Sequence, residues 1–169
     1  AARVRNAEQL TEIDCTLNLA VHNIPGFTRN SVILRSGTFA LASVGVRFQL
    51  LGATAHAAEP ERGHSPALAL ASLLQLLPTL SQECVPLGTM SKVTVTHARL
   101  GEPTFGTAPG EATLYVTLRA ESTMLLEQLE ERVGDLARGV AATHRLGLQS
   151  ERYEPFPATT NDPDLTEWA

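Results

Sequence analysis

Two hydrophobic periods alternate along residues 43–154, and their order restricts the folds available to the chain. Three segments have an apolar residue at every second position, as half-buried strands do, and a fourth is interpreted as a last strand: 43–52, 92–99, 112–119 and 148–154. Two segments repeat leucine and valine at three- and four-residue intervals, as amphipathic helices do: 65–78 and 122–146. The predicted order is therefore strand, helix, strand, strand, helix, strand.

This order predicts an α+β fold of the ferredoxin-like type, a two-layer βαββαβ sandwich. Its four-stranded antiparallel sheet carries both helices on one face and leaves the other face open. The same architecture serves RNA-binding, regulatory and dimerisation modules, so the fold alone does not select a function.

Local signals predict where the elements begin and end. Ser65 is a good N-cap with Pro66 at the first helical position, and Ser122 can cap the second helix, which Gly147 can terminate. The leucines of the first helix that we expect on one face are Leu70, Leu73, Leu74 and Leu77.

The first 42 residues show weaker patterns. Residues 3–12 are predicted as a short polar helix, and 15–22 and 31–35 as short extended runs. Between those runs, Pro25 and Gly26 predict a turn.

Composition and charge exclude several classes of function. The chain of 169 residues has a formal net charge of -5 and a single lysine, Lys92, so no basic stripe can follow a phosphate backbone. No apolar run reaches about 18 residues, and the start lacks a signal-peptide pattern, so we expect no membrane association. Cys15 and Cys84 form no C-x-x-C pair, which favours a reducing, cytoplasmic location.

The densest polar cluster is G-A-T-A-H-A-A-E-P-E-R-G-H-S-P, with His56 at its centre. Small alanine neighbours let a ligand approach the imidazole, which can donate a hydrogen bond to an oxygen that gains negative charge during acyl transfer. The alternative is a histidine that is solvated or hydrogen-bonded to nearby backbone.

Other polar residues near this cluster allow two interpretations. Arg62 and His64 could bind a substrate carboxylate, whereas Glu59 and Glu61 are equally placed to neutralise them. His97 alternates with two valines of its strand and is expected to share their face rather than bind a ligand.

Several segments resemble one enzyme family. The runs G-A-T-A-H-A-A-E-P and S-P-A-L-A-L-A resemble the G-x-x-x-H-A-A-x-P segment and the helix behind it in metal-dependent amidohydrolases related to aminoacylase, hippurate hydrolase and auxin-conjugate hydrolases. The runs L-A-V-H-N-I-P-G-F, F-G-T-A-P-G-E-A-T-L-Y-V-T-L-R and E-P-F-P-A-T-T-N-D-P extend the similarity in the right order along nearly the whole chain.

The resemblance implies two domains. One is a catalytic domain that holds zinc, manganese or a similar divalent metal; the other is an inserted ferredoxin-like lid that pairs with a second subunit. On this basis residues 1–42 are interpreted as a catalytic-domain fragment or linker, 43–154 as the lid and dimerisation domain, and 155–169 as the return linker. A homodimer is the expected assembly.

The resemblance also implies roles for single residues. His56 would reach the partner's active site and hydrogen-bond the scissile carbonyl oxygen. His22 falls at a metal-ligand position, the alternative being a histidine of a turn. Arg119 aligns with an arginine seen in relatives and would bind substrate, the alternative being a strand-end arginine that faces water or pairs with Glu121. Gly106 replaces an asparagine that helps to bind substrate in many relatives, which puts that contact in question. The H-x-C-G-H-D stretch and the Glu-Glu pair are missing, so we expect these residues alone to hold no metal and to be inactive.

The function that these observations favour is hydrolysis of the amide bond of an N-acyl amino acid or a similar small amide, with this chain as the lid. The competing hypothesis is a ferredoxin-like regulatory module that dimerises and binds a small molecule without catalysis. An RNA-recognition module shares the strand order, but residues 92–99 contain no aromatic stacking pair.

Overall fold

The computed structural model describes residues 19–23 and 25–168, in two units that divide after Ile33. Pro25 and Gly26 form a turn, as predicted, with Gly26 at a φ of 98°. Residues 19–22 and 31–35 belong to no strand, and residues 15–18 of the first expected run lie outside the described residues. The helix predicted at 3–12 lies outside the described residues.

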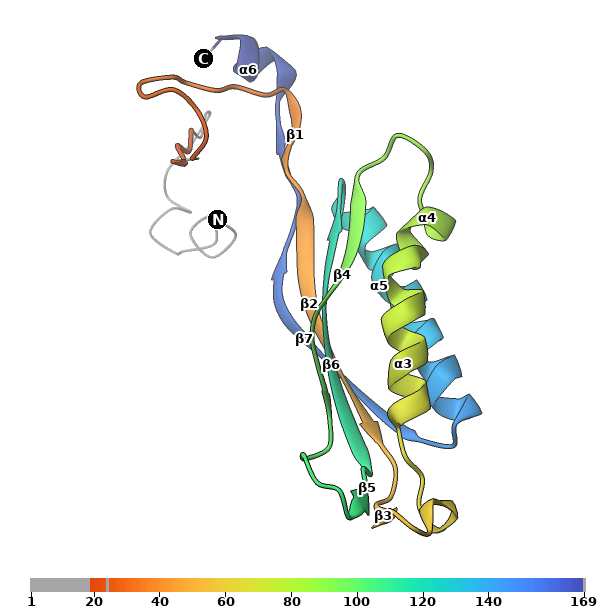
Figure 1. Ribbon diagram of the computed structural model, residues 1–169. Helices are drawn as coiled ribbons and strands as arrows, with labels where there is room; N and C mark the ends of the chain where they lie inside the picture. The colour runs from red at the N-terminus through yellow and green to blue at the C-terminus, as the bar shows by residue number, and fades with distance from the viewer. Residues whose placement is uncertain (1–18, 24, 169) are drawn as a thin grey trace, which may run out of the picture. The chain divides into compact units, whose positions relative to one another are not determined.

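The second unit, Leu34–Ala169, is built on one antiparallel sheet. Its four strands, in the spatial order β4-β6-β2-β7, are β2 (Ala42–Leu51), β4 (Ser91–Leu100), β6 (Glu111–Ala120) and β7 (Gly147–Phe156). The main helices are α3 (Ala67–Leu76) and α5 (Thr123–Thr143), and α3 leads through the 3-10 turn η2 (Leu77–Thr79) into the short α4 (Leu80–Cys84). These helices cover one face of the sheet (Figure 1), which confirms the predicted ferredoxin-like fold.

Two small ribbons extend the sheet at opposite ends (Figure 1). Where β2 begins and β7 ends, β1 (Gly37–Ala40) pairs with β8 (Thr159–Asn161), and α6 (Pro163–Trp168) follows. At the other end, β3 (Ala55–His56) pairs with β5 (Thr107–Ala108), and the 3-10 turn η1 (Pro60–Arg62) follows β3. We call the first end the hinge end and the second the His56 end.

The core lies between the sheet and the helices. Buried and half-buried residues alternate strictly along β2, as predicted from its sequence. The fully buried side chains include Val44, Phe48, Leu50, Leu73, Leu77, Leu114, Val116, Leu118, Leu129 and Val133. Ser122 caps α5 as predicted, because its Oγ accepts a hydrogen bond of 3.1 Å from the Leu125 backbone N–H.

Leu74 departs from the predicted stripe of the first helix, because it is 38% exposed whereas Ala69 is fully buried. A helix turns about 100° per residue, so Leu74 lies at the margin of the face that Leu73 centres. Ser72, on the opposite margin, lines a groove against Leu136 of α5. Leu74 therefore points away from α5.

His97 does not share a face with the valines of its strand. The pairing of β4 with β6 shifts between Val95 and His97, because Thr96 is an extra residue opposite β6. His97 consequently lies against Tyr115 on the open face of the sheet, with ring centroids 5.6 Å apart. The predicted alternation holds only as far as Val95.

The end of α5 is also different from the prediction. The helix stops at Thr143, and Arg145 rather than Gly147 takes the left-handed conformation, with a φ of 56°. The Leu146 N–H donates back to the Ala141 carbonyl at 2.9 Å, which closes the last turn as in a Schellman motif. Gly147 instead begins β7.

Packing of α5 against the sheet can be tested with two substitutions on the same helix. Leu129→Ala removes a buried side chain and should lower the free energy of unfolding by about 2–5 kcal/mol. Glu127→Ala, on the exposed side, should change it by less than about 0.5 kcal/mol. Urea denaturation measures both, and equal effects would contradict the proposed packing.

Candidate functional site

His56 is the last residue of β3, at the edge of a two-stranded ribbon. It stands opposite Thr107 of β5, and the next residue, Ala57, donates its N–H to the Gly106 carbonyl at 3.0 Å. The Glu59 N–H donates to the His56 carbonyl at 2.9 Å, so the chain turns away directly after the histidine. The imidazole is exposed, on a backbone that is held from both sides.

The hydrogen bonding of the ring defines its tautomer. The Ala58 backbone N–H lies 3.1 Å from His56 Nδ1, and a backbone amide can only donate. Nδ1 of the neutral ring is therefore the acceptor, and Nε2 carries the proton. A protonated Nε2 is the group required to donate a hydrogen bond to a developing oxyanion.

Three glycines allow the backbone segments around His56 to approach one another. A Cβ at Gly52 would lie 1.9 Å from the His64 carbonyl oxygen, one at Gly63 would lie 2.7 Å from the Ala53 oxygen, and one at Gly110 would lie 2.5 Å from the Thr54 nitrogen. Real Cβ atoms do not approach backbone so closely. We call this set the glycine junction, and it holds the base of the His56 ribbon.

The other polar residues of this loop have local partners. Arg62 forms an ion pair with Glu59 at 3.0 Å, one of the two carboxylates considered for that role. His64 exchanges two backbone hydrogen bonds with Ala53, of 2.9 and 3.1 Å, and its side chain is exposed. These contacts give both residues a structural part in the loop.

The open face of the sheet is polar. Arg47 of β2 forms an ion pair with Glu151 of β7 at 2.9 Å, and Glu151 also accepts a hydrogen bond from the Tyr153 hydroxyl. The hydrogen bond from its hydroxyl to Glu151 raises the pKa of Tyr153. A hydrogen bond with Tyr115 raises the pKa of Arg47. This network lies on the face of the sheet that the helices leave open, where a ligand of the sheet would bind.

Arg119 lies far from His56. It is exposed near the hinge end of β6, in register with Ser43 and Lys92. A ten-residue antiparallel strand spans about 30 Å, so the two predicted site residues are at opposite ends of the sheet. Gly106, by contrast, adjoins His56, and the position of its missing side chain is open, with nothing within 4 Å.

His22 belongs to the first unit, where it is exposed. Its Nδ1 lies 2.9 Å from the Asn23 carbonyl oxygen, which can only accept. Nδ1 of the neutral ring therefore carries the proton, and the lone pair of Nε2 is free, as in histidines that ligate metals. His22 and His56 thus present Nε2 in opposite protonation states.

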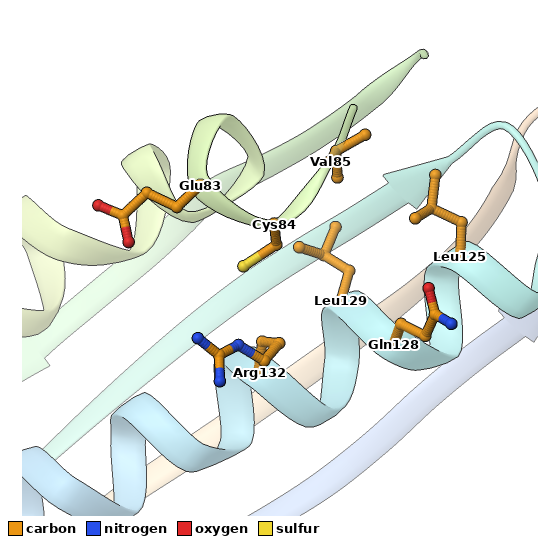
Figure 2. Close-up of a pocket in the computed structure, with 7 residues that line it drawn as sticks. All are labelled: Glu83, Cys84, Val85, Leu125, Gln128, Leu129 and Arg132. Atoms are coloured by element: carbon orange, nitrogen blue, oxygen red, sulfur yellow. The ribbon is translucent and has the colours of Figure 1, made fainter. Parts of the chain in front are cut away.

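Within the described residues, no three His, Cys, Asp or Glu side chains are grouped so that they could hold a metal ion. A cavity of about 250 Å³ lies between α4 and α5, and Figure 2 shows Cys84 pointing toward Arg132 there. The neighbouring thiol raises the pKa of Arg132. No helix in the described part is long and apolar enough to cross a membrane.

The described fold is an α+β sandwich with the His56 ribbon at one end and the β1–β8 ribbon at the other. The family model described as the peptidase dimerisation domain, M20 type, matches residues 37–145. The chain belongs to this family, which confirms the resemblance seen in the sequence. Membership implies that the domain forms a dimer.

Individual relatives agree with this assignment. The chain is 23% identical over 148 residues to N-acetyldiaminopimelate deacetylase of Lactobacillus helveticus, covering 87% of the chain and 38% of the relative. It is 21% identical to hippurate hydrolase of Campylobacter jejuni, and this match covers 88% of the chain and 38% of the relative. The chain therefore spans well under half the length of these relatives.

Solved structures show the same fold. A putative aminohydrolase from methicillin resistant Staphylococcus aureus matches with a TM-score of 0.74 and 18% identity, over 80% of this chain and 36% of that one. An aminobenzoyl-glutamate utilization protein from Klebsiella pneumoniae matches with a TM-score of 0.66 and 23% identity, over 79% of this chain and 33% of that one.

Sequence reasoning missed the glycine junction, because its closest contacts join residues ten or more positions apart in the chain. Its only sequence signal was the glycine content of the loops.

The glycine junction predicts that Gly52 tolerates no side chain. Gly52→Ala forces apart the 52–54 and 63–65 backbone segments and should cost about 1–3 kcal/mol of stability, as overpacking does. Amide hydrogen exchange at Ala53 and Ala57 should become faster. Gly106→Ala, which meets nothing within 4 Å, is the control and should leave exchange unchanged; faster exchange in both would contradict the junction.

Proposed function

We propose that this chain is the lid and dimerisation part of a metal-dependent amidohydrolase that cleaves the amide bond of N-acyl amino acids or similar small amides. His56 stabilises the carbonyl oxygen in the active site of the partner subunit. The names of the relatives, a deacetylase and a hippurate hydrolase, support this substrate class. The observation that carries the proposal is the His56 tautomer, because it leaves an Nε2–H donor exposed at the end of a ribbon held in place by backbone contacts.

The domain boundaries follow the same proposal. Residues 1–42 and 155–169 belong to the catalytic part and its linkers, and 43–154 form the lid. The pairing of β1 with β8 supports it, because this ribbon brings the two connections together at the hinge end. The Asn161 side chain donates a hydrogen bond to the Arg35 carbonyl at 2.9 Å, which also joins β8 to the segment that enters β1.

Of the two sheet edges, β4 is the one that we expect to pair. The β7 edge is blunted by charged residues and by Pro155, and Glu154 has a φ of 48°. The middle of β4, V-T-V-T, is uncharged and β-branched. Beside that edge, the side of α3 that faces away from α5 exposes Ala71 and Leu74, and Pro78 of η2 is exposed after them.

This pairing explains how His56 acts on the other subunit. Two β4 strands related by a two-fold axis run antiparallel, so the Ser91 end of one lies beside the Leu100 end of the other. Leu100 leads into the loop that carries β5, which pairs with His56. The His56 end of one protomer therefore approaches the hinge end of its partner, where the partner's own catalytic part is connected.

Arg119 and His22 have two separate roles in this proposal. Arg119, exposed near the hinge end, pairs with the carboxylate of an N-acyl amino acid. His22, whose Nε2 carries a lone pair, is a metal ligand, and the catalytic domain of the complete enzyme supplies the other ligands. A divalent ion bound there would polarise the amide carbonyl and lower the pKa of a water molecule.

Removal of the His56 imidazole should slow catalysis in the complete enzyme. His56→Ala removes one oxyanion donor and should lower kcat about a hundredfold to a thousandfold, whereas His64→Ala, on the adjacent segment, should have little effect. Steady-state kinetics on an N-acyl amino acid measures both. Full turnover by His56→Ala would rule out the proposed role.

Action across the dimer has a separate test. Co-expression of His56→Ala protomers with His22→Ala protomers yields mixed dimers in which one of the two composite sites keeps both histidines. The purified mixed dimer should be far more active than either parental homodimer. If His56 served its own subunit, the mixed dimer would be as inactive as its parents.

The β4 edge is tested by oligomeric state. Leu74→Glu places two like charges near the two-fold axis and should raise the dimer dissociation constant at least about tenfold. Leu68→Glu, on the other side of α3 and 70% exposed, is the matched control and should leave it unchanged. Sedimentation equilibrium measures both constants, and an unchanged dimer in Leu74→Glu would assign the interface elsewhere.

A further inference from the structure

Lys92 and Arg119 form a pair of like charges on the open face of the sheet. They are directly opposite each other in the pairing of β4 with β6, near the hinge end. Both side chains are exposed, and they point away from the helices because their neighbours Val93, Leu118 and Ala120 are buried in the core. The Cβ atoms of directly opposite residues lie about 5 Å apart, and like charges at such positions are destabilising.

No acidic side chain of the described fold neutralises this pair. Glu121, two residues after Arg119, instead accepts a hydrogen bond from the Met90 backbone N–H at 3.2 Å. In the described part of the chain, neither Lys92 nor Arg119 takes part in an ion pair. Two other cations of the same face are paired, Arg47 with Glu151 and Arg99 with Glu102.

Hydroxyl groups adjoin the two cations. Ser43 of β2 is opposite Arg119 on its other side, and Thr94 and Thr117 form the next pair on this face, toward the middle of the sheet. A hydroxyl can donate a hydrogen bond to a carboxylate, as an ammonium or guanidinium group can. The surface therefore combines two unpaired cations with several donors, which is the composition of a site for an anionic ligand.

We propose that Lys92 determines specificity for substrates whose amino-acid part carries a second carboxylate, as in N-acyl derivatives of aspartate and glutamate. This inference rests on the proposed function, in which Arg119 pairs with the carboxylate that every N-acyl amino acid has. Lys92 then binds the carboxylate of the side chain. Two or three carbon atoms separate the two carboxylates of these amino acids, so one molecule reaches cations on adjacent strands, and the flexible lysine stem adapts to either length.

The proposed dimer leaves this site accessible. Two β4 edges pair through backbone hydrogen bonds in the plane of the sheet, whereas the Lys92 side chain projects out of that plane. Lys92 is also the single lysine of a chain whose formal net charge is -5. The positive charge at this site is therefore a local feature, and a substitution of Lys92 tests it directly.

The experiment compares two substrates of the complete dimeric enzyme, N-acetylglutamate and N-acetylglutamine, which differ in the charge of the side chain. Lys92→Met removes the ammonium group and should lower kcat/KM about tenfold for the glutamate derivative and less than about twofold for the glutamine derivative. Lys92→Arg keeps the charge and should retain the wild-type preference for the glutamate derivative. Arg99→Met removes a paired cation of the same strand and face, and as the matched control it should leave the preference unchanged.

The outcomes separate this inference from the proposed function. Arg119→Met should reduce turnover of both substrates, because both have the α-carboxylate, and failure of that result counts against the proposed function. Equal losses on both substrates in Lys92→Met, the same change in Arg99→Met, or a wild type without preference for the glutamate derivative would each overturn the role of Lys92. Dissociation of the Lys92→Met dimer in sedimentation equilibrium would overturn it as well, by assigning Lys92 to the subunit interface.

A wild-type enzyme that cleaves neither substrate would contradict the proposed function, and binding then decides the role of Lys92. Calorimetric titration with L-glutamate and L-glutamine should show tighter binding of L-glutamate, and Lys92→Met should abolish the difference. Equal binding of the two amino acids by the wild type would overturn the role of Lys92.

Discussion

The structure depends on the need to cover one apolar face of a twisted four-stranded sheet. Alternate residues of the central strands β2 and β6 are fully buried, and two helices are required to remove that face from water. Once both helices lie on that side, the connections must run around the ends of the sheet. The loops at the His56 end and the linkers at the hinge end are therefore held apart by the length of the strands.

That separation gives the domain its two working ends. The hinge end gathers the chain entering β1 and the chain leaving β8. The other end carries a ribbon whose backbone is fixed by the glycine junction and whose His56 ring is oriented by the Ala58 amide. Since the two ends lie about 30 Å apart, the proposed function requires that a second copy lies alongside in the reverse direction.

Two histidines with the same intrinsic chemistry differ in the backbone group that contacts Nδ1. An amide N–H directed at Nδ1 leaves His56 with a donor at Nε2, whereas a carbonyl oxygen at Nδ1 leaves His22 with a lone pair there. This contrast rests on backbone groups, so no side-chain pattern in the sequence announces it. It supports the donor and ligand roles that the family resemblance implied for these positions.

The sequence alone determined the order of elements, the buried face of β2 and the Ser122 cap, because periodicity and capping are local. Local pattern failed where distant segments meet: the extra residue Thr96 turns His97 to the open face, Arg145 ends α5 in place of Gly147, and Leu74 stays at the helix margin. The tertiary structure decided the placement of His56 and Arg119 at opposite ends of the sheet and the contacts of the glycine junction. Each of these depends on which strands become neighbours, and that is set by burial of the whole core rather than by any one segment.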